Sequence, residues 1–343
     1  MITVATYGRG GSSARVRIHD WLDYLGVTDA ESYSYLGLAD NSFTTLGKNL
    51  SKVFAAERSL RSLAKRGTDD TLLMSREASP LSNGRLESRI LRSSRFSVYD
   101  FDDAIFHNAA PFPYSLYPKG KVWERSVRSA DHVLAGNDYL AEEAAKYSSS
   151  VQIMPSCVHP DDYVQKQHYD LNEKLTLAWM GSPATEPFLD ALAGPLMRLN
   201  QEIPLRLRII SRGRRSFGAL DEIVDRVDWQ ADTFGSQLAD ADAGLMPLPD
   251  TQFTRGKCAY KLLQYGAAAL PVIGSPVGVN RNVLGQLGGL SASNADEWES
   301  AIRSLFASTS AERRGMGEQA RFGVDRGFSF RAWAPQWAAA VRL

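Results

Sequence analysis

Each half of this 343-residue sequence begins with a short apolar strand, a glycine loop and a helix. In the first half, residues 2–7 read as the strand, 8–13 as the loop and 14–25 as an amphipathic helix. In the second half, residues 175–180 and 181–185 give the same strand and loop. Short apolar runs that end in polar or glycine residues are typical of buried parallel strands. The sequence therefore predicts a doubly wound α/β chain.

Further apolar runs predict more strands, at 71–75, 96–100, 132–136, 151–155, 205–210, 243–248 and 270–274. The stretch 159–173 is polar and has no periodicity, which favours a linker. We expect an N-terminal domain at 1–160, a C-terminal domain at 161–325 and a terminal helix at 326–343. That helix carries Trp333 and Trp337 on one face, and we expect this face to cover apolar residues.

Composition excludes several classes of protein. The 39 basic and 39 acidic residues balance, which argues against a large nucleic-acid surface. Cys157 and Cys258 are far apart and have no metal-ligand spacing, so neither a disulfide framework nor a zinc site is predicted and a reduced cytosolic setting fits. The five histidines show no paired spacing. No signal peptide or membrane-spanning run is predicted.

The first glycine loop ends in Gly10, Gly11, Ser12 and Ser13. Small residues before a helix let the backbone approach an anion, and a tight turn with a serine cap explains the same pattern. The loop is not GxGxxG, so a nicotinamide cofactor is not expected.

A cluster of acids ends the strand at 96–100, with Asp100, Asp102 and Asp103. Ligands of open α/β sheets lie beyond the carboxyl ends of the strands. Neighbouring acids suit acid–base work or cation binding. The other interpretation is a helix cap with acids in its first turn.

Lys257 and Lys261 are four residues apart in a helix-like stretch, so we expect them to share one helix face. Such a face could clamp a diphosphate, with Arg255 as a further member. The alternative is a solvated basic face. The small apolar residues at 267–271 indicate a mostly buried helix, which disfavours that alternative.

Residues 46–66 form an amphipathic pattern. We expect Leu46, Leu50, Val53, Leu60 and Ala64 on one face, with basic residues around it. Weak contact with an anionic membrane is one interpretation, and an ordinary surface helix is the other.

Four stretches of the second half resemble the nucleotide-sugar domain of GT-B glycosyltransferases, nearest to the retaining glycosyltransferase family 4: 179–185, 242–248, 256–265 and 270–280. In the first half, residues 10–17, 76–77 and 100–104 are similar to the same branch. The resemblance implies two Rossmann-like domains facing each other across a cleft, with the C-terminal helix crossing back to the N-terminal domain. The acceptor would lie against the first domain and the nucleotide sugar against the second.

The chain departs from the family pattern at three places. The Glu-x7-Glu positions hold Gly256 and Gln264, and the Arg and Lys pair after the strand at 175–180 is absent. Asp102 and Asp103 stand in place of a catalytic histidine.

The resemblance and these residues together assign the site. Catalytic residues are expected to be Asp102, Asp103 and Lys261. The donor diphosphate and sugar are expected at Gly11, Ser12, Gly181, Ser182, Arg212, Lys257, Lys261, Gly278, Val279 and Asn280. The nucleoside is expected at Ser211, Val227 and Trp229. No metal or other cofactor is expected, since the nucleotide sugar is a substrate.

The predicted function is transfer of a hexose from a nucleotide diphosphate sugar to an acceptor hydroxyl, with retention. The alternatives are a non-catalytic nucleotide-sugar binding protein and a nucleotide-sugar epimerase on the same scaffold. The acceptor is expected to be a small or lipid-linked molecule and not a nucleic acid. The expected location is cytoplasmic, with peripheral contact at the inner membrane face as the further interpretation.

Overall fold

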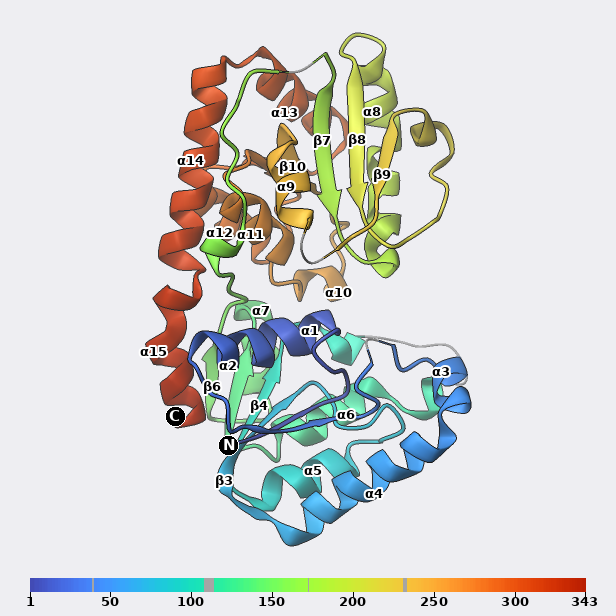
Figure 1. Ribbon diagram of the computed structural model, residues 1–343, viewed down its shortest axis with the longest axis vertical. Coiled ribbons are helices and arrows are strands. Elements are labelled where there is room, and N and C mark those ends of the chain that lie inside the picture. The colour runs from blue at the N-terminus through green and yellow to red at the C-terminus, as the bar shows by residue number, and fades with distance from the viewer. Residues whose placement is uncertain (39, 108–113, 172, 231–232) are drawn as a thin grey trace. The chain divides into compact units, whose positions relative to one another are not determined.

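The computed structural model describes residues 1–38, 40–107, 114–171, 173–230 and 233–343. The chain divides into two compact units (Figure 1). The first unit consists of Met1–Ser156, Arg255–Cys258 and Trp333–Leu343, and the second of Cys157–Thr254 and Ala259–Ala332.

The first unit is built on a parallel six-stranded sheet in the order β2-β1-β3-β4-β5-β6. Its strands are β1 (Ile2–Ala5), β2 (Glu31–Ser34), β3 (Thr68–Ser75), β4 (Ser94–Phe101), β5 (His132–Ala135) and β6 (Val151–Ile153). Strands β1 and β2 lie on one side of the point where the chain crosses over, and β3 to β6 lie on the other. In a doubly wound sheet this crossover is where ligands bind.

Helices surround this sheet (Figure 1). They are α1 (Ser12–Ala14), the π-helix η1 (Arg15–His19), α2 (Asp20–Tyr24), α3 (Phe43–Lys48), α4 (Leu50–Arg66), α5 (Arg85–Arg92), the 3₁₀ turns η2 (Ile105–His107) and η3 (Tyr114–Leu116), α6 (Lys119–Val127), α7 (Asp138–Ala145) and most of α15 (Phe330–Val341).

The second unit has its own parallel sheet in the order β12-β11-β10-β7-β8-β9. Its strands are β7 (Leu175–Met180), β8 (Leu205–Ile210), β9 (Val224–Val227), β10 (Ala243–Met246), β11 (Val272–Gly274) and β12 (Leu290–Ser291). Its helices are η4 (Pro160–Asp162), η5 (Pro183–Leu192), α8 (Ala193–Asn200), η6 (Gly218–Glu222), α9 (Phe234–Ala239), most of α10 (Gln252–Arg255), α11 (Tyr260–Ala267), α12 (Asn280–Leu287), α13 (Ala295–Ala307) and α14 (Ser310–Gly327).

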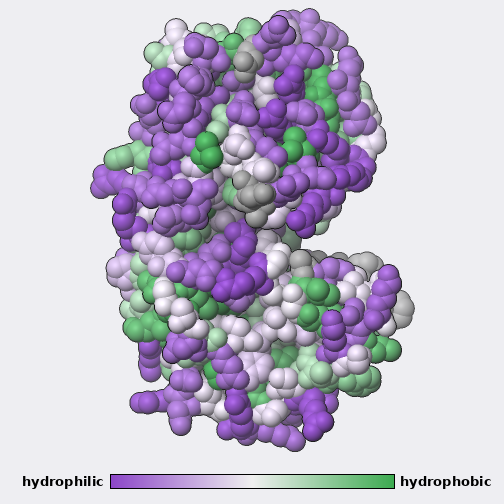
Figure 2. Space-filling view, in the orientation of Figure 1, coloured by the Kyte–Doolittle hydropathy of each residue, from purple (hydrophilic) through white to green (hydrophobic). Residues whose placement is uncertain are grey.

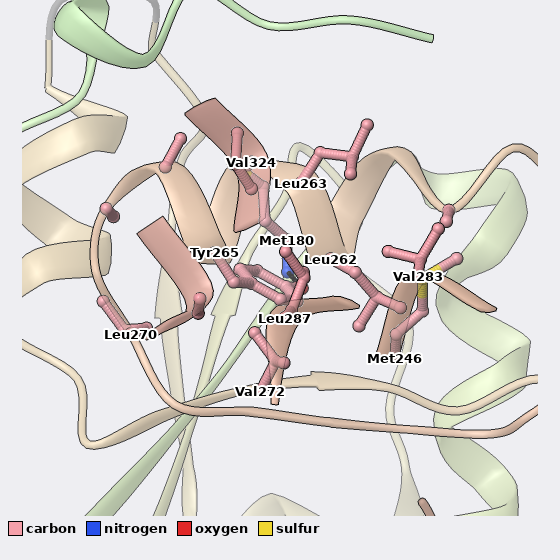
Figure 3. Close-up of a cluster of buried hydrophobic side chains, with 14 of the residues drawn as sticks. Met180, Met246, Leu262, Leu263, Tyr265, Leu270, Val272, Val283, Leu287 and Val324 are labelled. Atoms are coloured by element: carbon pink, nitrogen blue, oxygen red, sulfur yellow. Dashed lines mark hydrogen bonds between the residues drawn. The ribbon is translucent and has the colours of Figure 1, made fainter. Parts of the chain in front are cut away.

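Helix α11 packs closely on the second sheet (Figure 3). Leu262 and Tyr265 lie in one buried cluster with Met180 and Met246 from the ends of β7 and β10. The Tyr265 hydroxyl accepts a hydrogen bond from the Met180 backbone N–H, 2.9 Å away, and donates to the Leu245 carbonyl, 3.2 Å away. These contacts fix the start of α11 beside the carboxyl ends of β7 and β10.

The last helix supplies a large aromatic contact to the first unit. Trp337 is buried, and its ring stacks on that of buried Trp21 with centroids 5.3 Å apart.

Figure 2 shows that hydrophilic residues cover most of the face in view, with small separate hydrophobic patches. Within the described residues, no helix is both long and apolar enough to cross a membrane.

Two helix predictions differ from the structure. The pattern at 46–66 is broken at Asn49, where α3 ends and α4 follows. Leu50 then lies outside the buried stripe of Val53 and Leu60, with 58% of its surface exposed. The helix predicted to follow the glycine loop of the second half begins at Pro183 and is a 3₁₀ helix up to Leu192, with Pro187 inside it and lacking a backbone donor.

Candidate functional site

The first part of the site is a buried ion pair that ties η1 to the end of β4. The Arg17 guanidinium donates to both carboxylate oxygens of Asp100, over 2.5–3.1 Å, and to the Met154 carbonyl at 2.8 Å. Both side chains are 1% exposed. Burial raises the pKa of Asp100 even though Arg17 opposes the shift, and the charge of Asp100 raises the pKa of Arg17 although burial opposes it. Asp100 is thereby committed to structure and is unable to reach a ligand.

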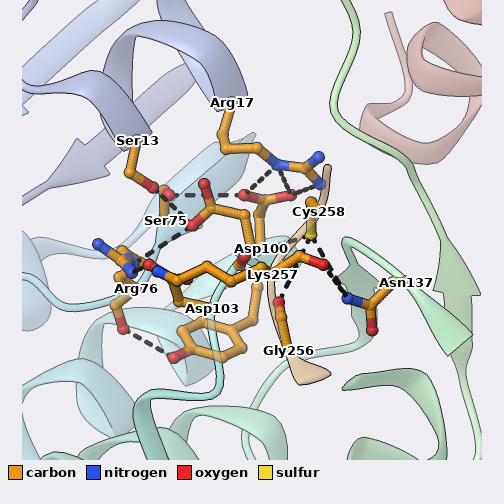
Figure 4. Close-up of polar contacts among 12 residues, drawn as sticks. Ser13, Arg17, Ser75, Arg76, Asp100, Asp103, Asn137, Gly256, Lys257 and Cys258 are labelled. Atoms are coloured by element: carbon orange, nitrogen blue, oxygen red, sulfur yellow. Dashed lines mark hydrogen bonds and ion pairs between the residues drawn. The ribbon is translucent and has the colours of Figure 1, made fainter. Parts of the chain in front are cut away.

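Asp102 and Asp103 follow β4 and have different partners; Figure 4 labels Asp103 together with Arg76 and Lys257, which pair with it. Asp102 accepts a hydrogen bond from the Ser13 hydroxyl at 2.8 Å, and Arg76 Nε lies 3.4 Å from the same oxygen. Asp103 pairs with Arg76 Nη2 and, at 2.6 Å, with the Lys257 amine. Both carboxylates are partly exposed, at 17% and 20%. The two acids are therefore brought together, but only Asp103 is held between two cations.

The cations keep Asp103 ionised. Burial alone would raise the pKa of this carboxyl, but the charges of Arg76 and Lys257 outweigh burial and lower it. The pKa of Arg76 is raised in turn by the charges of Asp103 and Asp102, against the opposing effect of burial. A carboxylate whose charge is already compensated makes a poor proton acceptor.

Arg76 is placed by an unusual backbone conformation directly after β3. Its φ is +63°, a left-handed value that costs a non-glycine residue about 1–3 kcal/mol. Its backbone N–H donates to the Asp100 carbonyl at 2.9 Å, and its carbonyl accepts from the Tyr99 hydroxyl at 2.7 Å. These bonds hold the conformation that turns the guanidinium toward Asp102 and Asp103.

The short segment Arg255–Cys258 completes this cluster within the first unit. The Asn137 side chain donates to the Lys257 carbonyl at 3.1 Å, and the Cys258 thiol donates to the Asp102 carbonyl at 3.2 Å. Gly256 lies so close to Ala104 that a Cβ at position 256 would come within 2.6 Å of the Ala104 Cβ. Glycine is therefore required here, and a glutamate would not fit.

The expectation that Lys257 and Lys261 share a helix face is wrong. Helix α11 begins at Tyr260, after Ala259 in a left-handed conformation with φ +56°. Lys257 precedes the helix and pairs with Asp103, whereas Lys261 lies in the first turn of the helix. Gly256 stands directly before Lys257, where α10 has ended, but the spacing of the two lysines suggested one continuous helix.

The first glycine loop is a tight turn at the start of α1. The Gly11 N–H donates to the Gly8 carbonyl at 2.9 Å, and Gly11 is the N-cap, with no side-chain cap. A Cβ on Gly11 would lie 2.3 Å from the Tyr7 Cβ. Ser12 is exposed, while Ser13 reaches Asp102. The serine cap considered from the sequence is therefore absent at this helix, for the residues that the structure describes.

The remaining predicted residues all lie beyond the carboxyl ends of strands in the second sheet. They follow β7 (Gly181, Ser182), β8 (Ser211, Arg212), β9 (Val227 as its last residue, then Trp229) and β11 (Gly278, Val279, Asn280). This edge is where open parallel sheets bind ligands.

Lys261 and Gly181 meet at the tryptophan that precedes the β7 loop. The Lys261 amine lies 5.4 Å from the centre of the Trp179 ring, within range of a cation–π contact. The same ring would lie 2.4 Å from a Cβ on Gly181. Glycine at 181 thus lets the loop pass close to Trp179, next to the lysine.

Arg212 and Trp229 form a second cation–π pair at the neighbouring strands. The Arg212 guanidinium carbon is 5.4 Å from the Trp229 ring centre, and its Nε donates to the Trp229 carbonyl at 3.4 Å. The ring of Phe234 stacks against Trp229 with centroids 5.9 Å apart. The Trp229 ring is thus contacted by both Arg212 and Phe234, and Arg212 is the most exposed of these three side chains.

The loop before α12 presents backbone N–H groups. Gly278 has a φ of +54°, and Val279 is the N-cap of the helix without a side-chain cap. Asn280 is buried, and its amide donates to the Ser275 carbonyl at 3.1 Å. Its side-chain oxygen accepts no hydrogen bond from the described residues. An uncapped helix start of this kind favours an anion.

Sequence reasoning did not list Ser13, Arg17, Arg76 and Asn137 as site residues. Arg17 offered a signal, because a charged residue alternating with Val16 and Ile18 on a mostly apolar helix requires a buried partner. The other three are ordinary polar residues until the folded strands place them beside Asp102 and Lys257.

No protein-family model matches the sequence, and no curated protein matches it. Solved structures do. WaaG, described as a glycosyltransferase involved in lipopolysaccharide biosynthesis, superposes with a TM-score of 0.67 at 16% identity, over 99% of this chain and 98% of that chain. The Burkholderia vietnamiensis α,α-trehalose-phosphate synthase (UDP-forming) gives 0.67 at 11% identity, over 99% of both chains. Anabaena HepE, in complex with UDP and glucose, gives 0.66 at 12%, over 99% of both chains.

These neighbours are GT-B enzymes, and the two parallel six-stranded sheets described above match their two Rossmann-like domains. This chain has the GT-B fold. At these identities the likeness is one of fold. Within the described part of this GT-B chain, no group of three or more His, Cys, Asp and Glu side chains is arranged to hold a metal ion.

Proposed function

We propose that this GT-B chain is a retaining glycosyltransferase, similar to family 4, that moves a hexose from a nucleotide diphosphate sugar to an acceptor hydroxyl. One observation carries the proposal: the carboxyl edge of the second sheet joins Lys261, the tight Gly181 loop and the uncapped start of α12. Neighbours of the same fold were solved with UDP or UDP-2-fluoro glucose, ligands with the diphosphate that such an edge suits.

In the proposed reaction, the bond between the anomeric carbon and the diphosphate oxygen breaks, and its electron pair stays on the diphosphate. The acceptor oxygen bonds to the same face of the anomeric carbon, and its proton passes to the departing phosphate. Lys261 and the N–H groups of Gly278 and Val279 stabilise the negative charge as it develops. Losing one donor of this kind lowers the rate about 10²–10³-fold at other anion-stabilising sites.

Of the two acids, Asp102 is proposed to contact the acceptor. Its carboxylate has one hydroxyl donor and a longer contact to Arg76, whereas Asp103 is enclosed by Arg76 and Lys257. Its proposed role is to orient the acceptor hydroxyl and to stabilise the positive charge on the sugar, so Asp102→Asn should lower kcat by about 10²-fold, on the scale of electrostatic stabilisation. Asp103→Asn should instead lower stability and activity together. If Asp103→Asn abolishes turnover in a fully folded protein while Asp102→Asn remains active, this assignment is wrong.

The nucleoside is proposed to lie toward β8 and β9. Neighbouring strands are about 4.8 Å apart, so the end of β8, three strands from β11, is about 14 Å from the start of α12. A diphosphate is much shorter than this distance. Arg212, stacked on Trp229, therefore lies where the base or ribose is expected, together with Ser211 and Val227. We propose this role for Arg212 in place of diphosphate binding.

The same proposal includes no metal and no other cofactor. Lys261 and the start of α12 supply positive charge and N–H donors for the diphosphate, which is the work that a metal ion performs in other phosphate sites. We also propose that Gly11, Ser12 and Lys257 contact the ligand. Gly11 and Ser12 would contribute backbone groups at the start of α1, and Lys257 would contribute its charge beside Asp103.

The proposed acceptor is a small or lipid-linked molecule, with weak contact to an anionic membrane through α4 at the cytoplasmic face. On that helix Leu50 and Phe54 are 58% and 73% exposed, and Lys52 and Arg58 are exposed beside them. Cosedimentation with vesicles containing about one-third phosphatidylglycerol should fall on Phe54→Glu. Equal sedimentation of both proteins would remove the membrane contact from the proposal.

A second candidate is a nucleotide-sugar binding protein without transferase activity. It is favoured by positions 256 and 264, where Gly256 has no room for a side chain and Gln264 is buried against the Tyr163 hydroxyl at 3.3 Å. Neither position offers a carboxylate to the sugar.

A thermal-shift titration tests the donor site first, with UDP, GDP, ADP, dTDP and NAD. A ligand at 100 times its Kd adds about 2.7 kcal/mol to the stability of the folded state. Lys261→Ala should lose this shift, and the exposed Lys174→Ala should keep it. Slow release of free sugar from the matching nucleotide sugar then separates a transferase from a binding protein. If no diphosphate shifts the melting temperature, or if only NAD does, the proposed function fails.

A further inference from the structure

The first unit contains a pocket of about 240 Å³ whose lining includes Gly8 and Arg9 of the glycine loop but none of the residues of the acid cluster. It lies between η1 and the face of the sheet formed by β1 and β2. Its wall includes Tyr7, Ile18 and Ala5 as apolar residues, and Thr3, Ser32 and Ser34 as hydroxyl residues. None of these residues belongs to the proposed transferase site.

Strand register explains why three hydroxyls line the pocket. Thr3 is paired with Ser32, and Ala5 with Ser34, so these four side chains share one face of the sheet. A face covered by a helix usually carries apolar residues. Here the Thr3 hydroxyl donates to the Ser32 hydroxyl at 2.9 Å, and both serines lie on the exposed edge strand. Ser34 has no side-chain hydrogen bond to any described residue.

His19 lies on the opposite wall, at the end of η1. Its side chain is only 7% exposed, and no described residue forms a hydrogen bond with its ring nitrogens. Burial, together with the nearby charge of Arg9, lowers the pKa of His19, although Asp23 opposes the shift. The neutral imidazole offers one donor and one acceptor.

The charged residues near the pocket compensate each other. Arg9, which lines the mouth, donates to both oxygens of Asp23 at 2.5 and 3.0 Å. A ligand in the pocket therefore meets neutral hydrogen-bonding groups, the hydroxyls and the His19 imidazole, beside an aromatic and aliphatic wall. That combination suits a molecule with several hydroxyl groups and an apolar carbon face, and it suits an anion poorly.

We propose that this pocket binds a single neutral polyol unit, such as a monosaccharide, with His19 and Ser34 as its hydrogen-bonding residues. The loop at its mouth continues to Ser13, which donates to Asp102, but no residue of the pocket wall belongs to the acid cluster. Binding is independent of nucleotide and of sugar transfer.

The test follows the His19 ring protons by NMR during titration with D-glucose, glycerol or inorganic phosphate, each to about 50 mM. A ligand of a dozen heavy atoms at ordinary efficiency has a Kd of about 1–10 mM. We expect a saturable shift with glucose, a weaker one with glycerol and none with phosphate.

Ser34→Leu fills the pocket from an exposed strand position and should abolish the glucose shift. Ser149→Leu, at an exposed position outside the pocket, should preserve it. Unchanged circular dichroism of both variants shows that they fold. The proposal is overturned if phosphate alone shifts His19, if no ligand does, or if the glucose shift survives in Ser34→Leu.

Discussion

Replacement of Arg17 by Met tests the most buried charges of the site. The variant keeps an unbranched apolar stem but removes the guanidinium donors to the Asp100 carboxylate and the Met154 carbonyl, leaving Asp100, among the described residues, only the long hydrogen bond from Ser75 at 3.5 Å. Asp100 is then a buried carboxylate without its cation. Removing one member of a buried pair destabilises a protein by about 3–5 kcal/mol, and we expect this loss at pH 8.

The loss should depend on pH in a defined direction. Folding raises the pKa of Asp100 above 3.8 even in the presence of Arg17, and loss of Arg17 raises it further. A carboxyl group with a raised pKa binds a proton on folding, so stability falls as pH rises from 3.8 to the folded value. The deficit of Arg17→Met should therefore grow by up to about 1.4 kcal/mol per pH unit between pH 5 and pH 7.

Hydrogen exchange of the β4 amides in urea measures this stability separately from the second unit. Arg15→Met, two residues away, is the matched control, because its partner Asp20 is 25% exposed, and it should lose less than about 1 kcal/mol. The double variant Arg17→Met/Asp100→Leu should recover most of the loss. A deficit below about 1 kcal/mol, or one that is equal at pH 5 and pH 7, would refute the reasoning.

Two further predictions concern packing. Gly256→Ala should displace Lys257 from Asp103, because the new methyl group overlaps Ala104. We expect the free energy of unfolding to fall by at least about 1 kcal/mol, measured by thermal unfolding. An alanine variant as stable as the wild type would show that the segment has room for a side chain. Trp337→Ala should destabilise the first unit by about 3–5 kcal/mol, since the indole is buried against Trp21. Trp337→Phe should lose less stability. Equal losses in the two variants would mean that ring stacking on Trp21 does not contribute to stability.

The buried strands were predictable because their apolar residues either form a continuous run, as in β7, or alternate with charged residues, as in β8. Strands β7 and β8 coincide with the predicted 175–180 and 205–210. The sequence did not reveal β2, β9 and β12, since their residues are partly exposed and carry no apolar run. Strands of this kind are recognisable only from the strand with which each pairs, which is β1 for β2, β8 for β9 and β11 for β12.

The candidate site was predictable to a similar extent. Strand ends identified Asp102 and Asp103 because ligand-binding residues of α/β sheets follow strands. The partners of these acids depend on the left-handed turns at Arg76 and Ala259, two positions where propensity predicts ordinary backbone. The sequence pattern therefore predicted which residues belong to the candidate site. The left-handed backbone at Arg76 and Ala259 determines which of them form ion pairs, and the pattern does not reveal it.

The first unit is assembled from three separate stretches of chain, and the last of them begins at Trp333. During synthesis, residues 1–156 emerge long before the helix that stacks on Trp21. The surface of Trp21 stays uncovered until residues 333–343 have been made, and Asp103 stays without its partner until Lys257 has been made. A chain that ends before residue 257 would therefore hold an incomplete acid cluster, and one that ends before residue 333 would leave Trp21 without its stacking partner.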